Sequence, residues 1–171
     1  MKKEYLFYER VRPFFVTHPY YLSLLKWTNR LVTLLMPLLY FYVLWAAYLK
    51  ASKTWIVLAY LLVPAIGFIV LSVIRKRMNW PRPYELGTFP PLLNREGKGR
   101  SMPSRHVFSA AIISTVAWGV NPLLSFLGLS LALLLAGVRV LAGVHFVRDV
   151  VVGFLSAILW GFFWFYLLGL F

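Results

Sequence analysis

Five long runs without a charged residue dominate the sequence and restrict what the chain can fold into. The runs cover residues 31–49, 55–74, 107–120, 123–138 and 150–171. An α-helix needs about 20 apolar residues to cross the hydrocarbon core of a bilayer. Hydrophobic residues make up 61% of the 171 residues, more than one soluble core of this size buries. We therefore expect an all-α, polytopic membrane helix bundle, with about five transmembrane helices in a single domain over residues 1–171.

Residues 1–30 precede the first run and differ from it in character. Charged residues, among them Glu9, Arg10 and Arg12, interrupt a stretch that is rich in aromatic residues. This mixture is typical of an amphipathic helix that lies in the membrane interface rather than across the membrane. The segment also lacks the compact apolar core of a signal peptide. We expect residues 1–30 to form an N-terminal interfacial segment.

The third and fourth runs are short for a membrane span. They cross only if the third helix starts near Ser104 and the fourth continues towards Val144. Asn121 and Pro122 form a turn signal between the two runs, which predicts a helical hairpin. A hairpin returns both outer ends to one membrane face. The polar loop 75–105 and the segment 139–149 are therefore expected to meet on that face.

The charge balance indicates an anionic partner in or at the membrane. The chain has 18 Lys and Arg against 5 Asp and Glu, a net charge of +13. The basic residues punctuate apolar runs instead of forming a solvated stripe, which favours lipid headgroups or a phosphate-bearing substrate over nucleic acid. With no cysteine, the chain forms neither disulfides nor thiolate metal sites.

The residues expected on this face are sufficient for phosphoester hydrolysis without a metal. His145 and Asp149 are four residues apart, so on a helix they share a face. Asp149 then accepts a hydrogen bond from one imidazole nitrogen and raises the basicity of the other. Several arginines can hold a phosphate and neutralise charge in a phosphoryl-transfer transition state. A second histidine, His106, is suited to protonating the leaving oxygen.

Two short motifs with fixed spacing lie in and beside the polar loop. The first is Arg75, six residues, then Arg82 and Pro83. The second is the tetrapeptide at 103–106, Pro-Ser-Arg-His. Each of these motifs alone occurs often by chance, so neither is specific without a further match elsewhere in the chain.

A third motif completes the set, and the three together resemble a known family. It consists of Arg139, five residues, His145, three residues and Asp149. The order and spacing are similar to those of the type 2 phosphatidic acid phosphatases, whose fold is shared with vanadium-dependent haloperoxidases. The family has Lys at position 75, Gly at 105 and Ser at 138, where this chain has Arg, Arg and Val. None of these departures removes the expected nucleophile, acid or orienting carboxylate.

The resemblance implies a role for each matching position. His145 attacks phosphorus and forms a phosphohistidine, Asp149 orients it, and His106 protonates the departing alcohol and then activates water. The residues implied to bind the phosphate oxygens are Arg75, Arg82, Ser104, Arg105 and Arg139. Neither a metal nor another cofactor is implied.

The expected activity is that of a metal-independent lipid phosphatase. Substrates within the family are phosphatidate, phosphatidylglycerophosphate, undecaprenyl diphosphate and the phosphate of lipid A. One alternative is a lipid phosphotransferase that uses the same site, which phosphate release without an acceptor lipid would argue against. Another is a non-enzymatic protein that binds or transports anionic lipids, whose function would survive loss of His145 because binding needs no nucleophile.

Two further expectations concern the orientation of the protein in the membrane and the role of the remaining basic residues. Basic residues concentrate on the expected active-site face, which by the positive-inside rule would be cytoplasmic. The resemblance implies the opposite, an outward or periplasmic site in a bacterial inner membrane, and we adopt that orientation as the expectation. The oligomeric state is not predicted. Five further basic residues are expected to contact headgroups or solvent rather than the reacting phosphate: Arg77, Arg95, Lys98, Arg100 and Arg148.

Overall fold

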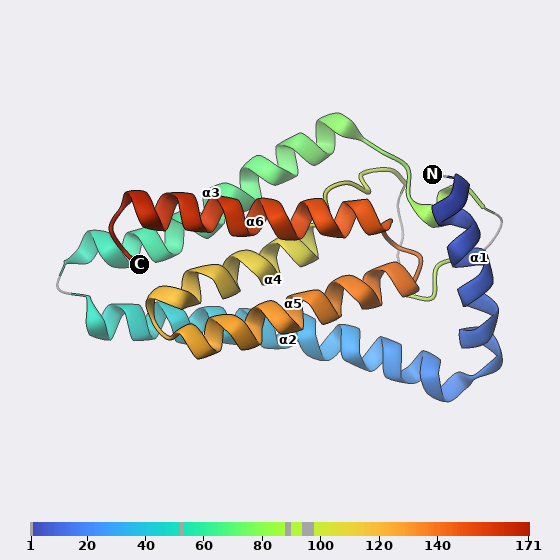
Figure 1. Ribbon diagram of the computed structural model, residues 1–171, viewed down its shortest axis with the longest axis horizontal. Helices are drawn as coiled ribbons and strands as arrows, with labels where there is room; N and C mark the ends of the chain where they lie inside the picture. The colour runs from blue at the N-terminus through green and yellow to red at the C-terminus, as the bar shows by residue number, and fades with distance from the viewer. Residues whose placement is uncertain (1, 52, 88–89, 94–97) are drawn as a thin grey trace.

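The computed structural model describes residues 2–51, 53–87, 90–93 and 98–171, and within them all regular structure is helical (Figure 1). The long helices run lengthwise through an elongated bundle, and α1 lies across one end. In chain order the elements are α1 (Lys2–Thr17), α2 (Pro19–Lys50), α3 (Thr54–Met78), η1 (Pro83–Glu85), α4 (Arg105–Val116), η2 (Ala117–Gly119), α5 (Pro122–Leu141) and α6 (Val147–Leu167). The expected all-α membrane bundle is confirmed.

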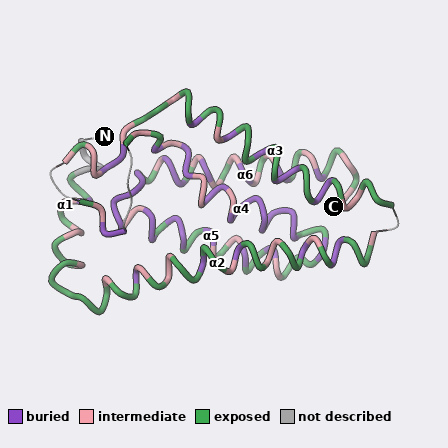
Figure 2. The backbone as a smooth tube through the Cα atoms, turned by 180° about the vertical axis from the view of Figure 1, so that it is seen from behind, coloured by how far each residue is buried: buried purple, intermediate pink, exposed green. Residues whose placement is uncertain are grey.

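Four helices, α2, α3, α5 and α6, are long and apolar enough to cross a membrane. The fifth expected span, α4, has only 12 residues before the short turn η2. It packs against α2, α3, α5 and α6, and all its residues from Val107 to Val116 except Ser109 are buried (Figure 2). Because protein rather than lipid surrounds α4, its length need not match the thickness of the bilayer.

The expected boundary at residue 30 is wrong. Only α1 lies across the end of the bundle, whereas residues 19–30 form the first turns of the 32-residue helix α2. Pro19 sits at the first position of α2, where its missing N–H costs nothing and its fixed φ favours a helix. Nothing in the sequence then interrupts the helix at Arg30. At 1.5 Å per residue α2 is about 48 Å long, which exceeds a hydrocarbon core of about 30 Å.

The predicted hairpin of the third and fourth runs is present. The Oδ1 atom of Asn121 accepts hydrogen bonds from the backbone N–H groups of Leu123 and Leu124, at 2.9 and 3.4 Å, and so caps the start of α5. The start of α4, the end of α5 and the start of α6 all lie at the end of the bundle that carries α1 (Figure 1). The backbone N–H of Leu92 donates to the carbonyl of Ala142 at 3.1 Å, which joins the polar loop to the turn between α5 and α6.

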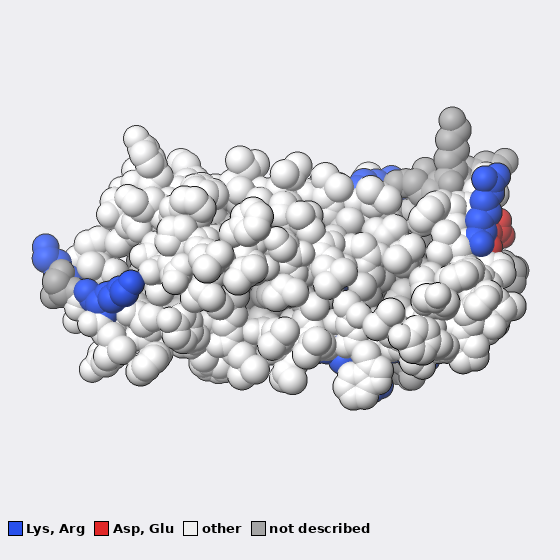
Figure 3. Space-filling model, turned by 60° about the horizontal axis from the view of Figure 1, so that its bottom comes forward, with Lys and Arg blue, Asp and Glu red and all other residues white. Residues whose placement is uncertain are grey.

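The surface is that of a multi-pass membrane protein. On the face shown in Figure 3, a broad uncharged region separates the charged side chains near the two ends. Large apolar side chains point outward from the long helices, for example Leu34 at 63%, Leu159 at 70% and Phe163 at 59% exposure. Soluble monomers rarely expose apolar patches of this extent, so lipid is the natural solvent of this surface.

Candidate active site

Asp149 is fully buried in the first turn of α6, where it caps the helix. Its Oδ2 atom accepts a hydrogen bond from the backbone N–H of Phe146 at 3.0 Å and another from the hydroxyl of Ser101. The Nδ1 atom of His145 lies 3.5 Å from the same oxygen. His145 precedes α6, so the expected shared helical face is wrong. The two side chains meet because the carboxylate reaches back over the start of its helix.

His145 belongs to the tight turn that joins α5 to α6. Gly143 adopts a φ of 71° in this turn, a conformation that an L side chain rarely adopts. The imidazole is 1% exposed, and its Nε2 atom has no hydrogen-bond partner among the described residues. Burial lowers the pKa of His145 to about 4, and the nearby positive charges of Arg82 and Arg75 add to the lowering while Asp149 opposes it. The ring is therefore neutral near pH 7, the state in which a histidine acts as a nucleophile or base.

Arg82 joins the polar loop to the His145 turn. Its Nη1 atom donates to the carbonyl of Val144 at 2.9 Å, next to the histidine. Its Nε and Nη2 atoms donate to the carbonyls of Gly99 and Arg100, at 3.0 and 3.1 Å. A planar guanidinium presents several donors in a fixed fork, which a lysine cannot reproduce. Arg82 is therefore placed beside His145 and at the same time ties residues 99 and 100 of the polar loop to the His145 turn.

Arg75 and Arg139 are also buried at this end of the molecule. Arg75 lies in the last turn of α3, and its Nη1 atom donates to the carbonyl of Pro103 at 2.9 Å. Arg139 lies in the last turn of α5, and its carbonyl accepts the backbone N–H of Val144 at 3.2 Å. Basic residues favour the last turn of a helix because they complement the helix dipole. The expected loop 75–105 accordingly begins after α3, at residue 79, and part of it, including the expected headgroup contact Arg95, lies outside the described residues.

Ser104 is placed directly against the Asp149 backbone. Its N–H donates to the Asp149 carbonyl at 2.9 Å, which ties the start of α4 to the start of α6. The hydroxyl is buried and has no hydrogen-bond partner in the described part of the chain. Burying a hydroxyl without a hydrogen-bond partner destabilises the folded protein unless a ligand or a water forms a hydrogen bond with it. This is the arrangement expected of a phosphate-binding serine.

Sequence reasoning missed two residues that shape the site, Ser101 and Glu85. Ser101 donates to the carboxylate of Asp149, and no spacing rule in the sequence indicates this contact. One oxygen of Glu85 accepts the backbone N–H groups of Arg82 and Gly99, at 3.2 and 2.7 Å. A signal for Glu85 did exist, because it is one of only five acidic residues and lies within a basic loop.

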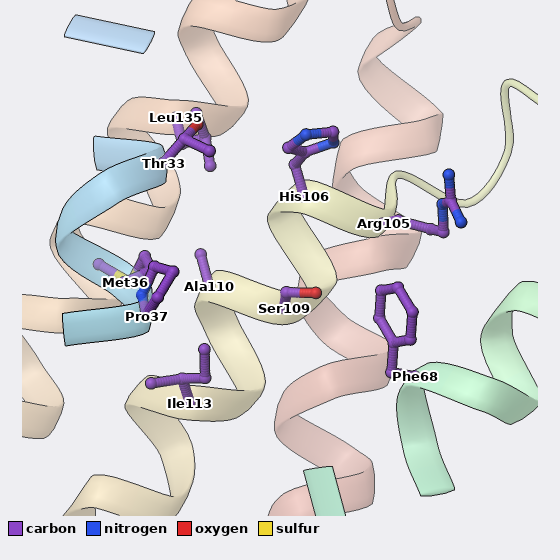
Figure 4. A pocket seen from close by; sticks show the side chains of 10 residues that line it. All are labelled: Thr33, Met36, Pro37, Phe68, Arg105, His106, Ser109, Ala110, Ile113 and Leu135. Carbon is purple, nitrogen blue, oxygen red and sulfur yellow. The ribbon is translucent and has the colours of Figure 1, made fainter. Parts of the chain in front are cut away.

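His106 and Arg105 lie in the first turn of α4 and line a cavity of about 310 Å³ between the helices (Figure 4). The guanidinium of Arg105 is 5.8 Å from the ring centre of Phe68. The deeper wall is apolar and includes Met36 and Ile113. A smaller cavity of about 60 Å³ approaches His145 from the side of α1. The structure thus joins His145, Asp149 and Ser104 by direct contacts, and places His106 and Arg105 beside Ser104, where they line a mostly apolar cavity.

A metal site would require several ligating side chains close together in the described part of the chain. Among the described residues, no three His, Cys, Asp or Glu side chains cluster as metal ligands would. The chemistry that the described site offers is that of a neutral imidazole next to a carboxylate, with buried guanidinium groups around it.

The chain is similar to known proteins in both sequence and fold. A family model described as the PAP2 superfamily matches residues 52–170, which include all three motifs. A comparison with curated protein sequences found no match.

Two solved structures are similar over most of the chain. The first is the transmembrane PAP2-type phosphatidylglycerolphosphate phosphatase from Bacillus subtilis, with 23% identity and a TM-score of 0.75 over 98% of this chain and 85% of that one. The second is LpxE from Aquifex aeolicus, with 26% identity and a TM-score of 0.67 over 87% of each chain. The chain thus shares the fold of these membrane proteins over nearly its whole length.

Proposed function

The chain belongs to the PAP2 superfamily, and we propose that it is a metal-independent lipid phosphatase that hydrolyses the phosphomonoester or diphosphate of a membrane lipid. The observation that carries the proposal is the buried, neutral His145 beside Asp149, with two buried arginines close to it at the end of the bundle that carries α1. A site built only to bind an anion has no use for a neutral imidazole held by a carboxylate. The combination favours a nucleophile.

The first chemical step forms a phosphohistidine. The Nδ1 atom of His145 faces Asp149, which leaves Nε2 to attack phosphorus. The new P–N bond forms as the bond from phosphorus to the lipid oxygen breaks, and His106 gives its proton to the departing alcohol or phosphate. In the second step water attacks phosphorus, loses its proton to His106 and breaks the P–N bond. Inorganic phosphate leaves, and His145 returns to its neutral form.

The phosphate oxygens are held by the residues that surround these groups. Arg75, Arg82 and Arg139 supply positive charge, and a guanidinium matches a phosphate in shape as well as charge. Ser104 contributes its otherwise unpartnered hydroxyl. Arg105, where the family motif has glycine, adds one more donor at the mouth of the 310 Å³ cavity. Positive charge at these positions stabilises the charge that develops on phosphorus in the transition state.

The lipid tail is proposed to occupy the apolar cavity. The cavity wall is formed by α2, α3, α4 and α5, and its polar groups, His106 and Arg105, lie at the start of α4 (Figure 4). A lipid that enters from the bilayer would thus bring its phosphate to the polar end. Phosphatidate, phosphatidylglycerophosphate, undecaprenyl diphosphate and lipid A phosphate all have this layout. We place the enzyme in a bacterial inner membrane with the site facing outward.

The test is phosphate release by the detergent-purified protein from a panel of these lipid phosphates, with and without EDTA. His145→Ala should abolish release, and EDTA should leave it unchanged. His18→Ala is the matched control, since His18 is exposed between α1 and α2. Release that persists in His145→Ala, or that EDTA removes, would contradict the mechanism. Release only when an acceptor lipid is present would identify a phosphotransferase instead.

A further inference from the structure

Arg148 lies between two aromatic rings beside the candidate catalytic pair. Its guanidinium carbon is 4.5 Å from the ring centre of Trp80 and 5.0 Å from that of Phe146. Trp80 belongs to the polar loop, whereas Phe146 directly follows His145 in the chain. Stacking on both rings fixes the plane of the guanidinium. The expectation that Arg148 contacts headgroups or solvent does not account for its contacts with both rings.

The position of Arg148 in its helix also calls for an explanation. It lies in the first turn of α6, where the helix dipole disfavours a positive charge. Its Nε and Nη2 atoms are shielded from solvent and have no hydrogen-bond partner among the described residues. The nearest acidic group is the Oδ1 atom of Asp149, 3.7 Å from Nε.

The two carboxylate oxygens of Asp149 therefore face different groups. Oδ2 accepts hydrogen bonds from Ser101 and the Phe146 N–H and faces His145. Oδ1 is buried and faces Arg148, and it too lacks a hydrogen-bond partner within the described chain. A shift of about 0.9 Å would convert the 3.7 Å approach of Nε to Oδ1 into a charge-assisted hydrogen bond, typically about 2.8 Å long.

We propose that Arg148 is a positioning residue for the reaction: it holds Asp149 through Oδ1, so that Oδ2 stays directed at Nδ1 of His145. The proposal rests on the proposed function, in which His145 is the nucleophile. Arg148 acts on the imidazole only through Asp149, in contrast to Arg75 and Arg82, whose charges act on His145 directly. Its contribution should therefore appear in the chemical step and not in substrate binding.

The experiment compares Arg148→Met with Arg148→Lys. Methionine keeps an unbranched apolar stem but removes the charge and the N–H donors, whereas lysine keeps the charge. We expect Arg148→Met to lower kcat by about 10- to 100-fold with KM nearly unchanged, the size that misplacement of a catalytic group produces. Arg148→Lys should recover most of this loss. Arg30→Met is the control, because Arg30 also lies over a tryptophan, Trp27, at 6.0 Å, but far along the chain from the site.

A double-mutant cycle with Asp149→Asn identifies the route of the effect. If Arg148 acts through the carboxylate, Arg148→Met should add little to the loss already caused by Asp149→Asn. Additive losses would overturn the proposal, and so would a raised KM with unchanged kcat, which would indicate that Arg148 binds the substrate. Failure of the proposed function is detected separately, by activity that survives His145→Ala. The lysine variant keeps the test decisive if the methionine variant does not fold.

Discussion

The buried imidazole of His145 is the residue whose chemistry most depends on its surroundings. An exposed histidine has a pKa of about 6.5 and is half protonated in mildly acidic solution. Burial, with help from Arg82 and Arg75, lowers the pKa of His145 to about 4. Only the neutral ring has a lone pair with which to attack phosphorus. The fold therefore keeps His145, the proposed nucleophile, neutral at a pH that would protonate an exposed histidine.

The pH dependence of kcat/KM tests this residue directly. Because protonation inactivates the nucleophile, activity should fall as pH decreases through the folded pKa of His145. We expect the part of the acid limb due to His145 to lie near pH 4. The substrate phosphate also ionises near pH 6, so its titration is measured separately and removed. If the corrected kcat/KM still falls as the pH decreases through about 6.5, His145 is not held in its neutral form.

At the scale of the helices, the start of α4 approaches α6 closely at a small residue of α6, Gly153. A Cβ atom on Gly153 of α6 would lie 2.8 Å from the carbonyl oxygen of Ser104 and 3.3 Å from its nitrogen. Both contacts are to backbone, which cannot rotate away as a side chain can. This approach permits the hydrogen bond from the Ser104 N–H to the Asp149 carbonyl. Ser104, the proposed phosphate-binding serine, is thus positioned by a glycine that takes no part in the proposed chemistry.

Gly153→Ala should consequently separate α6 from the start of α4. We expect it to lower the free energy of unfolding by about 1–3 kcal/mol, as overpacking does, and to lower phosphate release as well. Gly137→Ala is the matched control, because a Cβ there meets nothing within 4 Å. Thermal unfolding in detergent and the lipid phosphatase assay measure the two effects. Equal behaviour of the two variants would show that the close approach is not required.

Helix α1 packs on the turn that carries His145. Tyr8 is buried, its hydroxyl donates to the carbonyl of Pro90 at 3.0 Å, and its ring lies where a Cβ on Gly143 would be. The interfacial helix therefore contacts both the polar loop and the His145 turn.

Tyr8→Ala should remove this support, whereas Tyr8→Phe should largely keep it. Loss of the whole ring costs about 3–5 kcal/mol in a packed site, and loss of the hydroxyl alone about 1 kcal/mol. Activity should follow the same order. Phe14→Ala, on an exposed position of α1, is the control for general damage to the helix. An inactive Tyr8→Phe with an active Tyr8→Ala would exclude a packing role for the ring.

The sequence predicted the helical runs and the motif positions well, and the elements between them less well. Uncharged runs and fixed spacing are properties of the chain itself, so α3, α5 and α6 and the pair His145–Asp149 follow from them. The link from Ser101 to Asp149, by contrast, depends on contacts between distant segments. Such contacts leave no periodic trace in one sequence. The burial of α4 could not be predicted for the same reason, because it depends on the helices that pack around it.

For the whole molecule, the direction of insertion is where two physical arguments conflict. Basic residues gather at the end that carries α1, the polar loop and the His145 turn, while Lys50 and Lys53 lie at the α2–α3 connection. The positive-inside rule would place the first of these ends in the cytoplasm. Arg75, Arg82 and Arg139, however, are buried around the site, so their positions serve the proposed chemistry and say little about insertion.

The absence of cysteine from the natural chain makes this conflict simple to test. Lys98→Cys introduces a thiol in the polar loop, and Lys53→Cys introduces one at the opposite end; both positions are exposed. A membrane-impermeant thiol reagent is added to intact cells whose outer permeability barrier, where there is one, has been opened. With an outward site, position 98 should be labelled at once and position 53 only after the inner membrane is broken. The reverse pattern would show that the basic residues determine insertion, and that the lipid phosphate is cleaved on the cytoplasmic side.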